Sequence, residues 1–152
     1  MGRSLTTADY QALAELRHEI RRFLHFSEQA ARRAGLEPRQ HQLMLSLKGL
    51  PPRVRPSIGE LAQRLLIEHH SAVELVNRLA KGGYVQRERD GEDRRAVLVS
   101  LTRKGEKILR DLSLDHRAEL RVQGPALTTA LRRTIQSSKN RKASSSQNSS
   151  KS

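Results

Sequence analysis

The polar side chains best suited to bind another molecule gather between residues 71 and 95 of this 152-residue chain. One group recurs at helical spacing and ends just before Gly82-Gly83. A second surrounds the turn-forming run Asp90-Gly91-Glu92-Asp93 and is rich in arginine. Amide, carboxylate and guanidinium groups can hydrogen-bond to base edges, and cations bind phosphates. The candidate binding residues are Ser71, Glu74, Asn77, Arg78, Lys81, Arg87, Arg89, Asp93, Arg94 and Arg95.

Two short helices must position the first group. Ser57 and Glu60 have the spacing of a capping box, in which each side chain satisfies a free backbone donor at a helix start. A break over 66–69 separates this helix from a second one over about 70–81, and Gly82-Gly83 suits a helix end that needs a left-handed residue. The pair predicts a helix-turn-helix. Its expected buried residues are Ile58, Leu61, Ala62 and Leu65 in the first helix and Ala72, Val76 and Leu79 in the second.

A β-hairpin is expected to present the second group. Residues 84–89 and 96–101 have the composition of strands, and the run 90–93 between them is a turn former. Thr102 is placed to cap a following helix. The hairpin tip would project beside the helix over 70–81, which predicts a winged helix-turn-helix. The expected fold class is mainly α with a small β-hairpin, in which dimerisation helices flank the winged helix-turn-helix.

The order of these residues resembles the MarR (multiple-antibiotic-resistance regulator) family of bacterial transcription regulators. The resemblance implies a homodimeric, sequence-specific DNA-binding regulator of transcription, most simply a repressor released by a small aromatic or anionic effector. The residues that carry it are Gly59-Glu60-Leu61-Ala62, Leu75-Val76-Asn77-Arg78-Leu79, Gly83-Tyr84-Val85 with Arg87, and Asp93-Arg94-Arg95 with Leu101-Thr102 and Gly105.

The resemblance also implies how each group meets double-stranded DNA. The helix over 70–81 would enter the major groove, where each base pair presents a distinct set of donors and acceptors. Arg95 would enter the minor groove, and Asp93 would hold that side chain extended. The remaining arginines of the hairpin, Arg87, Arg89 and Arg94, would contact phosphates.

Three residues of the helix keep two interpretations. Asn77 and Arg78 either contact DNA or are structural, with Arg78 paired to an acid at the base of the hairpin. Because a carboxylate repels phosphate, Glu74 either accepts a hydrogen bond from N4 of cytosine or pairs with a neighbouring arginine. The pairing is the favoured interpretation of Glu74.

The flanking segments are expected to build a dimer that reads a pseudo-palindromic operator. Residues 1–35 form a dimerisation helix, residues 36–105 the winged helix-turn-helix, and residues 106–136 C-terminal dimerisation helices broken at Gly124-Pro125. Residues 137–152 form a basic, serine-rich tail that is expected to be disordered. The apolar stripe of the first helix, too large for a monomer of this size, is Leu13, Leu16, Ile20, Phe23 and Leu24.

The composition argues against several other classes. The chain has no cysteine, and therefore no disulfide framework or thiol redox sensor. It lacks a long apolar run and a signal-peptide-like start, so we expect a cytoplasmic protein without a membrane partner. Its six histidines lack metal-ligand spacing, so no metal or other cofactor is expected. No catalytic spacing such as Gly-x-Ser-x-Gly occurs, so we expect no enzyme.

The net charge of +13 supports an anionic partner without locating the binding site. Residues 57–105 carry nine basic and seven acidic groups, whereas residues 137–152 carry four basic and no acidic groups. Residues 57–105, which carry the characteristic residues, are therefore not the most basic part of the chain. The alternative interpretation is a non-specific architectural protein that binds nucleic acids through charge alone.

Overall fold

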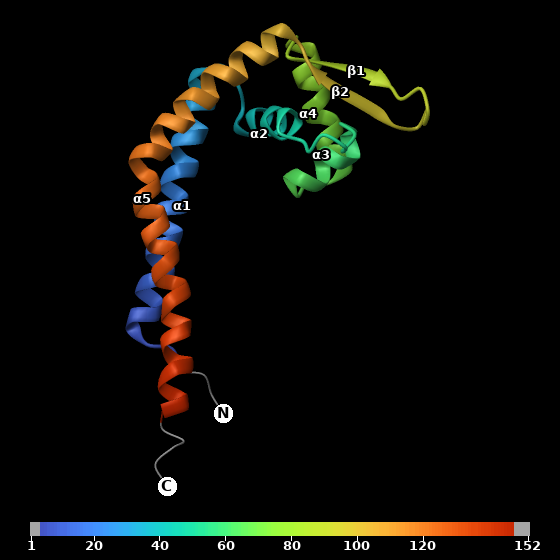
Figure 1. Cartoon of the computed structure of the whole chain (residues 1–152). Coiled ribbons are helices and arrows are strands. Elements are labelled where there is room, and N and C mark those ends of the chain that lie inside the picture. Colours follow the sequence, from blue (N-terminus) through green and yellow to red (C-terminus); the bar gives the residue numbers. More distant parts are fainter. Residues whose placement is uncertain (1–3, 148–152) are drawn as a thin grey trace. The chain divides into compact units, whose positions relative to one another are not determined.

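The structure, a computed structural model, describes residues 4–147 and the side chains of residues 4–136 (Figure 1). The described residues form two compact units, one made of 4–26 with 116–147 and the other of Ser27–Asp115. The elements follow the chain in the order α1 (Thr7–Arg33), α2 (Pro38–Lys48), α3 (Ile58–Leu65), α4 (His69–Lys81), β1 (Val85–Arg89), β2 (Val97–Leu101) and α5 (Arg103–Gln147). The mainly helical fold with one antiparallel hairpin confirms the predicted fold class.

The unit Ser27–Asp115 contains the helix-turn-helix. The Ser57 side chain caps α3 by accepting the N–H of Glu60 at 3.1 Å, and Leu66 adopts a left-handed conformation (φ 55°) that turns the chain toward α4. Gly83, also left-handed, ends α4 as predicted. The apolar faces of α2, α3, α4 and β2 meet in one core, in which Leu43, Met44, Leu61, Val76, Leu79 and Val99 are fully buried.

The hairpin is joined to this core at its base. β1 and β2 pair antiparallel in a register that places Val85 opposite Leu101 and Arg89 opposite Val97. The N–H of Val99 donates to the carbonyl of Pro56 at 2.8 Å, which adds the segment before α3 to the open edge of the hairpin. The hairpin is therefore fixed to the helix-turn-helix along β2, while its tip projects away from it (Figure 1).

A second junction connects the hairpin to α5. The backbone N–H of Thr102 donates to Tyr84 O at 3.0 Å, and its hydroxyl donates to Gly83 O at 2.6 Å and accepts the N–H of Gly105 at 3.1 Å. Lys104 lies over the Tyr84 ring, 4.5 Å from its centroid, and donates to Gly82 O at 2.8 Å. These contacts give Gly83-Tyr84, Thr102 and Gly105 a structural role where the hairpin meets α5, away from the tip of the hairpin.

In the other unit α1 and α5 run side by side and antiparallel, as Figure 1 shows. The Gln123 amide donates to Glu19 O at 3.1 Å, and the Thr134 hydroxyl donates to Ala12 O at 3.3 Å. The His116 ring meets the ring of Phe26 edge-on, with centroids 5.4 Å apart. Along this pair the larger apolar side chains that remain exposed are Leu13, Ile20, Leu24, Leu120, Val122, Leu131 and Ile135.

The predicted break at Gly124-Pro125 is wrong, because α5 continues through Pro125. A proline inside a helix removes one hydrogen bond and costs about 3 kcal/mol. Contacts of α5 with α1 on both sides of Pro125, at Gln123 and Thr134, hold the two halves in line and offset that cost.

The predicted helix end near Gln136 is also wrong, since α5 extends to Gln147. The disorder predicted for the tail is therefore not what the structure describes over 137–147, and residues 148–152 lie outside the described part. Extending an existing helix avoids the cost of nucleation, so the helix continues although five of these eleven residues are serine.

One local prediction holds only in part. The capping box predicted at Ser57 is half formed, because Glu60 turns instead to Arg64 at 3.1 Å. A complete capping box occurs at the start of α2, between Glu37 and Gln40.

Among the described residues, no helix has both the length and the apolar content that a membrane span requires.

Candidate nucleic-acid interface

Helix α4 has one face in the core and one face in solvent. Ala72, Leu75, Val76 and Leu79 are buried, which fixes the rotation of the helix about its axis. The opposite face carries the predicted binding residues: Ser71 is half-buried, and Glu74, Asn77, Arg78 and Lys81 are exposed. The sequence pattern therefore predicted the exposed face of α4 correctly, and a fixed rotation is what a base-reading helix requires.

The hairpin lies next to α4, and one side-chain contact ties the two together. Arg87 on β1 donates from Nη1 to Asn77 Oδ1 on α4. Between the helix and the hairpin lies a groove of about 400 Å³, and its lining includes His69, Val73, Asn77, Arg87, Asp93 and Arg95. The structure thus brings members of both predicted groups to one groove.

The hairpin tip is shaped by two carboxylates. Asp93 Oδ1 accepts the backbone N–H of Arg95 at 3.0 Å, so Asp93 orders the backbone of the tip, where the prediction had it hold the Arg95 side chain. Asp90 is only 4% exposed; it accepts the N–H of Glu92 at 3.0 Å and forms an ion pair with Arg55. The tip therefore leaves the hairpin in a defined direction, and it exposes the side chains of Arg89, Arg94 and Arg95.

Neighbouring side chains bear on two of the open alternatives. Arg78 is paired, but its partner is Glu37 at the start of α2, 3.1 Å away, and not an acid at the base of the hairpin. Glu74 is exposed, and within the described part of the chain no ion pair joins it to an arginine. The favoured interpretation of Glu74 as an arginine partner is therefore not what the structure describes.

The sequence analysis missed His69, His70 and Arg55. The two histidines form the first turn of α4 and are exposed, and His69 lines the groove toward the hairpin. A polar pair just after a helix N-cap, on the face that carries the binding residues, was a signal that could have found them. Arg55 gave no signal, because two helices and a strand separate it from its partner Asp90 in the sequence.

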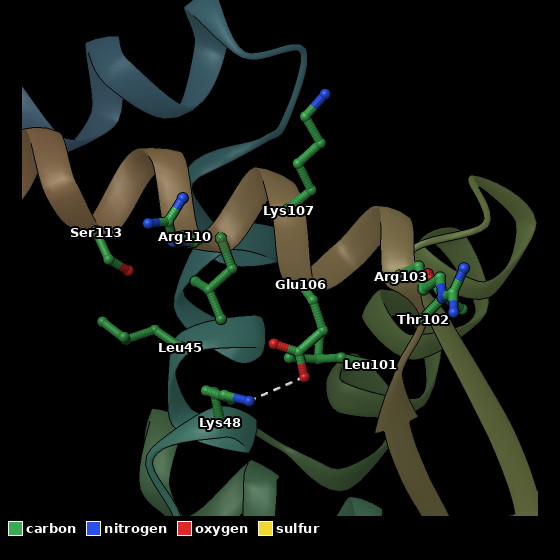
Figure 2. Close-up of a pocket in the computed structure, with 10 residues that line it drawn as sticks. Leu45, Lys48, Leu101, Thr102, Arg103, Glu106, Lys107, Arg110 and Ser113 are labelled. Carbon is green, nitrogen blue, oxygen red and sulfur yellow. Dashed lines mark hydrogen bonds and ion pairs between the residues drawn. The ribbon is translucent and has the colours of Figure 1, made fainter.

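A second cavity, of about 760 Å³, lies between α2 and the first turns of α5 (Figure 2). Leu45, Leu101 and Leu109 supply its apolar walls, and Ser113 points into it from α5 (Figure 2). Lys48 and Glu106 form an ion pair of 2.9 Å at its edge. Leu45 is 44% exposed here.

Metal binding finds no support in the described residues, because they contain no group of three or more His, Asp or Glu side chains that could hold an ion. His41 is buried among the core residues of α2, and His116 packs against the rings of Phe23 and Phe26.

A buried helix-turn-helix with an exposed polar face on its second helix, beside an arginine-rich hairpin, defines a winged helix-turn-helix protein. Residues 34–96 match the model of the MarR family, which covers helices α2 to α4 and the first strand of the hairpin. This region of the chain is therefore similar to the MarR family in sequence.

Individual proteins show a similarity to the chain in sequence or in fold. An uncharacterised HTH-type transcriptional regulator of Bacillus subtilis, YcgE, is 34% identical over 87 residues, which make up 57% of this chain and 54% of that protein. The matched region thus spans about half the length of this relative. The crystal structure of AbsC, a MarR family transcriptional regulator from Streptomyces coelicolor, has a TM-score of 0.69 at 22% identity, over 80% of this chain and 82% of that one. The transcriptional regulator MOSR of M. tuberculosis, solved in complex with DNA, has a TM-score of 0.56 at 19% identity, over 82% of this chain and 92% of that one.

Proposed function

We propose that this chain is a homodimeric, sequence-specific DNA-binding repressor of transcription that acts in the cytoplasm and is released by a small-molecule effector. The observation that carries the proposal is the groove between α4 and the hairpin, where an anchored polar helix and an arginine-bearing tip flank one surface. The structure of MOSR in complex with DNA supports the same use of this fold.

The two elements that flank this protein groove, α4 and the hairpin tip, suit the major and the minor groove of B-DNA. The major groove, about 12 Å wide, admits an α-helix, and α4 would enter it with Glu74 and its neighbours toward the bases. Arg95 would reach into the adjacent minor groove, whose negative potential attracts guanidinium groups. Lys81, Arg87, Arg89 and Arg94 would contact phosphates and set the orientation.

The unit built from α1 and α5 is the proposed dimer interface. Its exposed apolar side chains, which include Leu13, Ile20 and Leu131, occur on both helices, and grouped apolar side chains in water are typical of an interaction surface. A second copy of the chain would cover them. A two-fold dimer then requires a pseudo-palindromic operator, with half-site centres about one helical turn (~10 bp) apart.

The cavity beside α5 is the proposed effector site. Its walls are apolar, and its edge carries Lys48, which could leave Glu106 for the carboxylate of an aromatic or aliphatic acid. An occupant would press on Leu101, the last residue of β2, and so on the base of the hairpin. Displacement of the hairpin from the minor groove would weaken DNA binding, which is the behaviour of an effector-released repressor.

Selection of bound fragments from randomised DNA tests the proposal. We expect an inverted repeat, bound at least a thousand-fold more tightly than random duplex at the same salt concentration. Equal competition by random DNA would refute sequence-specific binding and favour the architectural alternative. A single asymmetric half-site at full affinity would refute the dimer.

A further inference from the structure

We propose that Glu74 is a specificity-determining residue, which selects a C·G base pair in each half-site by accepting a hydrogen bond from N4 of cytosine. This inference rests on the proposed DNA binding and specifies the base that α4 reads. A carboxylate on a DNA-facing helix is unfavourable near phosphates, so the position of Glu74 needs a compensating interaction.

The helix presents Glu74 in a fixed place. Its immediate neighbour Leu75 and the next residue, Val76, are buried in the core, while Glu74 is exposed. The side chain lies one turn after His70 and one turn before Arg78, in the middle of the outer face of α4. Glu74 also belongs to the N-terminal half of α4, which is the half of a recognition helix that contacts base edges.

The neighbours of Glu74 do not neutralise it. An acid and an arginine four residues apart on a helix normally attract each other, so Arg78 is the natural partner of Glu74. Arg78 instead contacts Glu37, with Nη1 3.1 Å from Oε2. The oxygen of Asn77, the next polar group on the helix, accepts from Arg87. Among the described polar groups of this face, these contacts engage Asn77 and Arg78 and leave Glu74 facing outward.

The chemistry of the major groove then selects the base. A carboxylate only accepts hydrogen bonds, so it is repelled by the acceptors of guanine (N7 and O6) and of thymine (O4). Adenine offers the N6 donor, but its acceptor N7 lies beside that donor. Cytosine itself presents the N4 donor and no acceptor in the major groove, so it is the base that a carboxylate tolerates best.

The test compares wild type, Glu74→Ala and Glu88→Ala on the selected operator and its variants. Glu88 is a matched control, because it is also an exposed carboxylate but lies on the face of β1 opposite to Arg87. Each C·G pair of the half-site is replaced in turn by the other base pairs, and by N4-methylcytosine, in which a methyl group takes the place of the donor hydrogen in the major groove. Both substitutions are at exposed positions, and an unchanged urea midpoint confirms that the fold is intact.

For wild type and Glu88→Ala we expect a loss of about 5- to 10-fold at one C·G position, for the other base pairs and for N4-methylcytosine. For Glu74→Ala we expect equal binding to the duplexes that differ at this one position, and tighter binding to random DNA because a negative charge is gone. A Glu74→Ala variant that keeps the wild-type base profile would overturn this inference alone. A wild-type protein that binds every duplex equally would overturn the proposed function as well, so the two failures are distinguishable.

Discussion

Replacement of Gly105 by alanine should destabilise the protein, although alanine favours helix. Gly105 lies in the first turn of α5, against the backbone of Tyr84. A Cβ atom at this position would overlap the carbonyl oxygen of Tyr84, lie 3.1 Å from its carbonyl carbon and lie 3.2 Å from Leu101 Cδ2. The neighbour is backbone and cannot rotate away, so the strand or the helix must shift.

The expected magnitude follows from three contributions. Alanine in place of glycine stabilises a helix by about 1 kcal/mol. Overpacking against a fixed neighbour costs about 1–3 kcal/mol. The displaced Tyr84 carbonyl also accepts the N–H of Thr102 at 3.0 Å, and loss of that hydrogen bond costs about 1 kcal/mol. Together they predict a loss of about 1–3 kcal/mol in the free energy of unfolding.

Urea unfolding followed by circular dichroism measures this loss. With an m-value of about 2 kcal/mol/M, the midpoint should fall by roughly 0.5–1.5 M. Gly59→Ala, in helix α3, is the control, because a Cβ there would meet Ser57 Oγ at an ordinary 3.9 Å. We expect that control to unfold at or above the wild-type midpoint. A Gly105→Ala protein with an unchanged midpoint would show that the packing of α5 against Tyr84 does not matter for stability.

Three further predictions concern two residues of the hairpin tip and one of the proposed dimer interface. Arg95→Ala should weaken operator binding more than random-DNA binding, by about 1–3 kcal/mol of discrimination in a salt-series titration; equal losses would mean that Arg95 contacts only phosphates. Ile20→Glu should place a charge on the proposed dimer surface and yield monomers in sedimentation, and an intact dimer would contradict that surface. Asp90→Ala should lower the free energy of unfolding by about 1–3 kcal/mol, because it removes the buried partner of Arg55 and of the Glu92 N–H, and urea unfolding at the wild-type midpoint would refute this.

Local patterns were enough to predict the winged helix-turn-helix. Turn residues and apolar spacing act over a few positions, so the starts and ends of α3, α4 and the hairpin agree with the sequence to within one or two residues. The continuity of α5 was not predictable in this way. Pro125 is a local signal for a break, whereas the contacts that override it come from α1, more than a hundred residues earlier in the chain.

The sequence predicted which side chains of the candidate site are exposed, but not which other side chains they contact. Periodicity placed Asn77 and Arg78 on the outer face of α4, as observed. It could not show that Arg87 holds Asn77, or that Glu37, on another helix, holds Arg78. These pairings depend on how α2, α4 and β1 pack, and they leave Glu74 as the base-reading candidate.

The junction at Thr102 explains how the proposed effector site could act on DNA without touching α4. Thr102 donates to Gly83 O and Tyr84 O, directly after α4, and it follows Leu101 in the wall of the cavity. A hundred-fold loss of operator affinity requires about 2.7 kcal/mol of coupling, since each factor of ten corresponds to about 1.4 kcal/mol. Two hydrogen bonds of about 1 kcal/mol each supply most of that amount. A ligand that fits the cavity only when these two bonds are broken would therefore be sufficient to release the DNA, because its binding and the intact junction would exclude each other.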